Sequence, residues 1–93
     1  MRAEEVIQEV VRLCRKYQAA EVILFGSRAK GTAQLKSDID IAVSGVTEFE
    51  DLKAEIEDLP TLYSVDLVDL DSCRNHLLLE DIQLYGQKIY KKV

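Results

Sequence analysis

The segment from Asp38 to Val43 constrains the fold more than any other part of the chain, because its residues alternate strictly in polarity. Asp38, Asp40 and Ala42 would lie on one face of an extended strand, and three branched aliphatic residues would lie on the other. A strand of this kind must bury its apolar face against other elements. The segment therefore predicts a rigid strand that displays two carboxylates on the same side.

The rest of the chain shows helix and strand patterns of ordinary length. The second predicted helix begins in a capping box of Thr47 and Glu50, and Asp71 or Ser72 would cap the third. A polar loop between the first two strands is expected to begin with a helical turn. The predicted helices are residues 3–17, 47–59 and 71–84, and the predicted strands are residues 21–25, 38–43, 62–70 and 88–91.

This order of elements predicts a single α/β or α+β domain over residues 1–93, with a small mixed sheet flanked by helices. A domain of this size buries only about 60–65% of its unfolded surface. We therefore expect a homodimer or hetero-oligomer, formed through apolar residues of the last helix such as Leu77, Leu78 and Leu79.

Composition excludes several classes of function. The net charge of −5 disfavours direct binding to nucleic acid, which needs a basic surface. Cys14 and Cys73 form no C-x-x-C pair and are expected to be buried thiols in a reducing compartment. The single histidine, His76, gives no support for a zinc site. No apolar run reaches the ~18–20 residues of a membrane span and no signal peptide is evident, so we expect a cytoplasmic protein.

Asp38 and Asp40 are two residues apart, so their Cα atoms would lie about 6.5–7 Å apart on one face of the strand. Like charges at this distance repel each other unless a cation or water lies between them. Carboxylate oxygens suit Mg²⁺, and such a pair can bracket two ions about 3.5–4 Å apart for phosphoryl transfer. For these two residues alone, an acidic strand face without a function is the simpler interpretation.

Gly26 and Ser27 end the first predicted strand, where a glycine lets the backbone approach a phosphate group. Backbone N–H groups and the Ser27 hydroxyl could donate to phosphate oxygens, and Arg28 could add positive charge. A plain turn followed by solvated cations is the alternative. The spacing from Gly26 to Gly31 imitates a P-loop, but Thr32 stands where that motif requires lysine, so we reject a P-loop.

The third predicted strand carries Asp66 and Asp69, which face opposite sides because they are three residues apart. Only one of them can join the face that carries Asp38 and Asp40, and periodicity does not choose between them. A solubilising charge at the edge of the strand is the alternative for either residue. The role of Lys30, like those of Asp69 and His76, stays open.

The spacing Gly-Ser, ten residues, then Asp-x-Asp runs here from Gly26 to Asp40. It resembles the motif of the minimal nucleotidyltransferase (MNT) family, within the DNA polymerase β-like superfamily. The segment GSRAKGTAQLKSDIDIAV resembles the family sequence throughout. The segment VDLVDLD resembles the family's third strand, whose first aspartate maps to Asp66. The last helix followed by Gly86 also resembles the family's ending, so the resemblance covers nearly the whole chain.

The resemblance implies a nucleotidyltransferase fold and the transfer of a nucleoside monophosphate, AMP from ATP, to a hydroxyl acceptor with release of pyrophosphate. It also implies two Mg²⁺ ions as cofactors, which Mn²⁺ could replace. The implied metal-binding and catalytic residues are Asp38, Asp40 and Asp66, and the implied nucleotide-binding residues are Gly26, Ser27 and Arg28.

Small members of this family are antitoxins paired with helical HEPN-domain proteins. The resemblance therefore implies a HEPN partner that is adenylylated on a tyrosine. The alternative is a nucleotide-binding antitoxin without catalysis, which neutralises its HEPN partner by forming a complex. The presence of all three aspartates favours the enzyme over this binding subunit.

Overall fold

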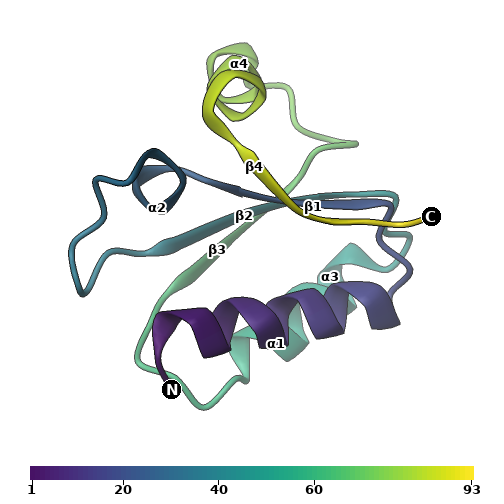
Figure 1. Cartoon of the computed structure of the whole chain (residues 1–93). Coiled ribbons are helices and arrows are strands. Elements are labelled where there is room, and N and C mark those ends of the chain that lie inside the picture. The colour runs from purple at the N-terminus through teal and green to yellow at the C-terminus, as the bar shows by residue number, and fades with distance from the viewer.

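Four strands form one mixed sheet in the order β3-β2-β1-β4, which confirms the predicted sheet type. The computed structural model describes residues 1–93 (Figure 1). Strand β1 pairs antiparallel with β2 and β4, whereas β2 and β3 run parallel. The strands are β1 (Glu21–Phe25), β2 (Ile39–Ser44), β3 (Val65–Asp69) and β4 (Gln87–Lys91), and the helices are α1 (Ala3–Lys16), α2 (Ser27–Lys30), α3 (Phe49–Glu57) and α4 (His76–Tyr85).

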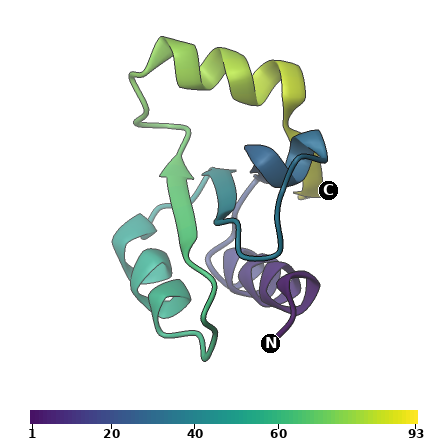
Figure 2. The same cartoon turned by 90° about the vertical axis from the view of Figure 1, so that its left-hand side faces the viewer.

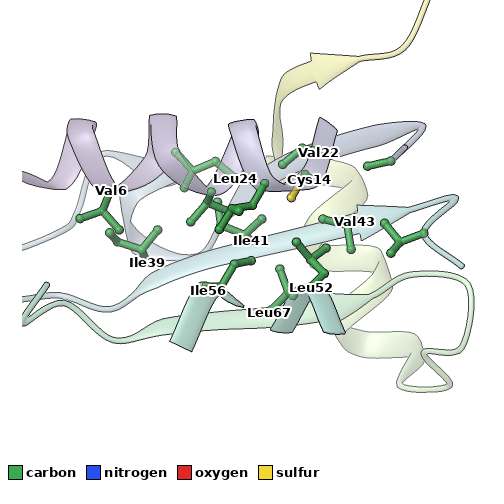
Figure 3. Close-up of a cluster of buried hydrophobic side chains, with 14 of the residues drawn as sticks. Val6, Cys14, Val22, Leu24, Ile39, Ile41, Val43, Leu52, Ile56 and Leu67 are labelled. Carbon is green, nitrogen blue, oxygen red and sulfur yellow. The ribbon is translucent and has the colours of Figure 1, made fainter. Parts of the chain in front are cut away.

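The main hydrophobic core lies between the sheet and helices α1 and α3, which cover the same face (Figures 1 and 3). Ile39, Ile41 and Val43 of β2 have no exposed surface and point into this core, as the alternating pattern predicts. Burying a side chain of this kind contributes about 1.5–3 kcal/mol. This packing holds the opposite face of β2, where Asp40 lies, on a rigid element.

A second, smaller core lies on the other face of the sheet, beneath α4. It consists of Phe25 from β1, Ala42 from β2 and Ile82 from α4. The sequence pattern predicts one apolar face for β2, but Ala42 is fully buried as well because α4 packs over it. Helix α4 lies on the other side of the sheet from α1 and α3 (Figure 2). On this face of β2, Ala42 is therefore covered by α4, whereas Asp40, two residues earlier, is only partly buried.

Helix α3 begins one residue later than the predicted capping box allows. Its N-cap residue is Glu48, whose side chain makes no capping hydrogen bond, so the box of Thr47 and Glu50 is wrong. The helix ends at Glu57, a short distance before Pro60, as that proline predicts.

Helix α4 is capped by Asn75, not by Asp71 or Ser72 as predicted. The Asn75 side chain accepts a hydrogen bond from the backbone N–H of Leu78 at 3.2 Å. Asp71 instead accepts a hydrogen bond from the N–H of Gly45 at 2.7 Å, which joins two distant loops. Asp71, which the local sequence assigns to the cap of the helix, therefore makes a tertiary contact instead.

Helix α4 ends before Gly86, as predicted, but the reason is a close approach of two elements. A Cβ atom at Gly86 would overlap the carbonyl oxygen of Ile82 and lie 2.7 Å from Cγ2 of Ile23. Strand β3 starts at Val65, three residues later than predicted, because its pairing with β2 begins at Ile39, and Leu62 is fully exposed in the preceding loop.

The exposed apolar residues differ in part from those expected. Leu77 is 80% exposed on α4, but Leu78 packs against the smaller core, so it is not free for an interface. Cys14 is buried as predicted, whereas Cys73 is only partly buried, and both thiols are free. None of the helices combines the length and apolar character that crossing a membrane requires.

Candidate functional site

The parallel pairing of β2 and β3 brings two of the predicted carboxylates together. Asp40 is the direct register partner of Asp66, between the partners Ile39–Val65 and Ile41–Leu67. Residues in register on neighbouring strands point to the same face of a sheet, so both carboxylates lie on the side away from α1 and α3. Asp66 is exposed and Asp40 is partly buried.

Asp69 does not join this face. It is the register partner of Val43, whose side chain points into the main core. Its carboxylate accepts hydrogen bonds from the N–H of Asp71 at 3.0 Å and from the Ser72 hydroxyl at 3.2 Å. Asp69 therefore organises the turn after β3, and the structure answers the choice between Asp66 and Asp69 that periodicity leaves open.

Asp38 lies one residue before β2, in an exposed position. Burial raises the pKa of the Asp40 carboxyl above its usual value. Repulsion from the negative charges of Asp66 and, next in size, Asp38 raises it further. Asp40 thus lies within the electrostatic field of both other aspartates. The charged form of Asp40 is disfavoured in the absence of a compensating cation.

The Gly-Ser turn lies directly against Asp40. Phe25, the last residue of β1, is the register partner of Asp40, and Gly26 follows it. Gly26 has φ +73° and ψ −154°, a backbone conformation open essentially to glycine alone. A Cβ atom at this position would overlap Oδ2 of Asp40. The missing side chain of Gly26 therefore leaves room for the Asp40 carboxylate beside the turn, and Ser27 begins helix α2 there.

The Arg28 side chain is engaged within the protein. Its Nη2 donates a hydrogen bond to the carbonyl oxygen of Ser37 at 2.8 Å, and its guanidinium carbon lies 5.2 Å from the centre of the Tyr63 ring. Its Nε is shielded from solvent and has no partner. Sequence reasoning missed Tyr63 as a residue of the site, because it lies within the predicted strand over residues 62–70, where a single tyrosine carries no functional pattern.

Lys30, whose role the sequence left open, joins α2 to α4. Its Nζ is 2.9 Å from Oδ1 of Asp81 and 5.0 Å from the centre of the Tyr85 ring. Gln87 adds a hydrogen bond from Nε2 to the carbonyl oxygen of Ala29 at 2.8 Å. The C-terminal segment therefore holds the short helix that follows the Gly-Ser turn, and His76 lies exposed at the far end of α4, apart from these contacts.

The chemistry of the three carboxylates fits a hard divalent cation. Their oxygens are the ligand type that Mg²⁺ prefers, and a cation between them would relieve the repulsion that acts on Asp40. Their present arrangement is open: no group of three or more His, Cys, Asp or Glu side chains is placed to enclose a metal ion. Asp38 and Asp66 are exposed, so rotation of these two side chains costs little packing.

Comparisons with known proteins identify one matching family. A sequence profile of the family described as "Polymerase beta, Nucleotidyltransferase" matches residues 8–93. No curated protein sequence matches the chain significantly.

Solved structures of similar fold include toxin–antitoxin complexes. A chain of a toxin–antitoxin complex with AMP-PNP is 26% identical, with a TM-score of 0.68 over 91% of this chain and 73% of the other. A mutant MntA–HpeT toxin–antitoxin complex is 26% identical, with a TM-score of 0.66 over 92% and 72%. The complex of tri-AMPylated Shewanella oneidensis HEPN toxin with MNT antitoxin is 22% identical, with a TM-score of 0.63 over 96% and 72%, and that likeness shows the fold alone.

Proposed function

The chain belongs to the polymerase beta nucleotidyltransferase family, and from this premise we propose that it transfers AMP from ATP to a tyrosine hydroxyl of a HEPN-family partner, as the antitoxin of a toxin–antitoxin pair. The observation that carries the proposal is the register pairing of Asp40 with Asp66, beside the turn at Gly26. The similar toxin–antitoxin complex with AMP-PNP supports an adenine nucleotide as ligand. The choice of a HEPN tyrosine as acceptor rests on the resemblance to the minimal nucleotidyltransferase family, and a chain of the same fold is found in complex with an AMPylated HEPN toxin.

The proposed roles follow from where each residue lies. Asp38, Asp40 and Asp66 would hold two Mg²⁺ ions, for which Mn²⁺ can substitute. The Ser27 hydroxyl would donate a hydrogen bond to oxygens of the β- and γ-phosphates. Gly26 lets the backbone approach the same phosphates, since it carries no side chain between them and Asp40. Bound Mg²⁺ would neutralise the charge that builds up on the phosphates during transfer.

The proposed reaction needs no covalent enzyme intermediate. The acceptor oxygen forms a bond to the α-phosphorus, and the bond from that phosphorus to the oxygen bridging to the β-phosphate breaks. Pyrophosphate leaves with the electron pair of the broken bond. The hydroxyl proton passes to the exposed carboxylate of Asp66 and then to water. Catalysis on this scheme is positioning and electrostatic stabilisation.

The alternative function is a nucleotide-binding antitoxin without catalysis, which acts by forming a complex with its HEPN partner. On that alternative, complex formation with the partner would be unaffected by Asp38→Asn and Asp40→Asn, and no AMP adduct would form.

The experiment that separates these functions uses α-labelled ATP and Mg²⁺, added to the protein in a lysate of its own cells. We expect label on a protein band, whose mass identifies the acceptor. Asp66→Asn should abolish the band, whereas Asp69→Asn, on the same strand but the opposite face, should keep it. Absence of label with the wild-type protein, together with Mg²⁺-dependent nucleotide binding, would support the binding subunit.

The same proposal sets the cellular context. The chain acts in the cytoplasm as a single domain over residues 1–93, bound to its HEPN partner or as a homodimer. Exposed apolar residues of α4, Leu77 and Leu84, support an interface on that helix. Its net charge of −5 argues against direct binding to nucleic acid.

A further inference from the structure

We infer that Arg28 is a positioning residue, which clamps the loop that carries Asp38 against α2 and the segment before β3, and that this clamp sets the geometry of the metal-binding carboxylates. The inference deepens the proposed function and rests on it for the role of the carboxylates. The clamp itself stands on contacts within the chain.

One side chain touches all three segments of the candidate site. Arg28 belongs to α2 and follows the Gly-Ser turn directly. Its hydrogen bond goes to Ser37, the residue immediately before Asp38. Its guanidinium lies over the ring of Tyr63, in the loop that leads to Asp66 on β3. Among the side chains of α2, only Arg28 makes a hydrogen bond or a cation–π contact with either of the other two segments.

The shape of the guanidinium explains how it can make both contacts together. The group is planar, so its face can lie on an aromatic ring while an N–H at its edge donates to a carbonyl oxygen. A lysine ammonium could make either contact but has no plane with which to make both. Nε is also shielded from solvent, although it has no hydrogen-bond partner, so this part of the guanidinium is packed inside the protein.

The clamped loop has a structure of its own that depends on the position of Ser37. The N–H of Ser37 donates to the carbonyl oxygen of Gln34 at 3.0 Å, and the N–H of Gln34 donates to the Ser37 hydroxyl at 2.8 Å. The N–H of Ile39 then donates to the carbonyl oxygen of Ser64 at 2.9 Å, where β2 meets the approach to β3. Asp38 lies between these two anchored points, so Arg28 acts on it through Ser37.

The first test measures hydrogen exchange in the metal-free protein, with no nucleotide present. Arg28→Lys and Tyr63→Leu should each speed exchange of the amides at Gln34, Ser37 and Ile39. Tyr63→Phe, which keeps an aromatic face, should behave like the wild type. Lys30→Gln is the matched control, since this neighbouring cation of α2 pairs with Asp81 on α4.

The second test measures binding of AMP-PNP by calorimetry over a range of Mg²⁺ concentrations. Arg28→Lys and Tyr63→Leu should each raise the Mg²⁺ concentration at half-saturation about tenfold, the size expected when a residue that orients a metal ligand is lost. The double variant should be no worse than the single ones, because both residues act through one contact.

The outcomes separate the clamp from the proposed function. Unchanged exchange at Gln34, Ser37 and Ile39 in both single variants would overturn the clamp, whatever the binding data show. A lower affinity for AMP-PNP in Arg28→Ala at every Mg²⁺ concentration, with Arg28→Lys like the wild type, would overturn it in favour of a phosphate contact. Failure of the wild-type protein to bind AMP-PNP with Mg²⁺ would count against the proposed function, while the exchange result still decides the clamp.

Discussion

Asp40 on β2 and Asp66 on β3 are direct register partners across a parallel pair of strands, so their carboxylates leave the sheet on the same face. Burial, together with the negative charges of Asp66 and Asp38, raises the pKa of Asp40. A sheet designed for stability alone would not place like charges opposite each other. The pairing therefore stores electrostatic repulsion that a bound cation would relieve.

Asp40→Asn should lower the rate of AMP transfer about 10²-fold or more, because the bound metal that stabilises the charge on the phosphates loses a ligand. The same substitution should stabilise the metal-free protein at neutral pH. The measurements are label transfer and urea unfolding in the presence of a chelator. A variant that is both inactive and less stable than the wild type would contradict this view of Asp40.

The pH dependence of stability gives a check on the same substitution. Since the folded-state pKa of Asp40 is raised, the folded protein binds more protons than the unfolded chain between the unfolded-state pKa, about 4, and the higher folded-state pKa. The contribution of Asp40 to stability is thus present at low pH and is lost as pH rises through its folded-state pKa. The stability advantage of Asp40→Asn should appear over that range and vanish at lower pH.

Gly26→Ala should destabilise the protein by about 1–3 kcal/mol and also weaken nucleotide binding. The reason is twofold, since φ is +73° at this residue and the new Cβ would displace the Asp40 carboxylate. Gly31→Ala is the matched control, because Gly31 has φ +74° but no atom lies within 4 Å of an added Cβ. Gly31→Ala should lower the free energy of unfolding by about 1–2 kcal/mol and leave nucleotide binding unchanged. Equal loss of binding in both variants would contradict the contact with Asp40.

Ile82→Ala should destabilise the protein by about 2–5 kcal/mol, because Ile82 is 4% exposed and is the residue of α4 buried in the smaller core. We expect faster hydrogen exchange along α4 and around α2, which Lys30 joins to it. Leu84→Ala on the same helix should change stability by less than about 0.5 kcal/mol, since Leu84 is 65% exposed. Similar losses from both substitutions would show that α4 packs differently.

Tyr17 should ionise only at strongly alkaline pH. A hydrogen bond from its hydroxyl to Glu55 raises the pKa of Tyr17 to about 12, because ionisation would place two negative charges together. The stability that Tyr17 contributes through this pair is fully present from neutral pH up to about pH 10 and is lost as pH rises through about 12. The same hydrogen bond lowers the pKa of Glu55, so the pair is also lost in acid, where Glu55 becomes protonated. Phenolate absorbance measures the titration, with Tyr17→Phe to assign it. Glu55→Gln should lower the pKa, and an unchanged titration would rule out the hydrogen bond as its cause.

Sequence patterns predicted the kinds of element and their order, and they were least accurate at the ends of elements. The strand over residues 21–25 has the predicted bounds, because its apolar run follows the polar Glu21 and stops at Gly26. The starts of α3 and α4 differ from the prediction, since Glu48 and Asn75 occupy the cap positions and Asp71 bonds to Gly45. Local signals cannot show when a distant backbone group takes a capping side chain.

The residues of the candidate site also fall into two groups, those that the local sequence placed and those that only the tertiary structure placed. The sequence by itself placed Asp40 on the polar face of a rigid strand and Gly26 at the end of its neighbour, since the alternation of side chains along a strand is a local property. It also placed Asp38 on that strand, which in the structure begins one residue later, at Ile39. Tertiary structure alone decided that Asp66 and not Asp69 faces Asp40, and that Arg28 turns toward Ser37 and Tyr63. The register between two strands depends on how their apolar residues pack across the shared core, and that packing joins segments that no local pattern connects.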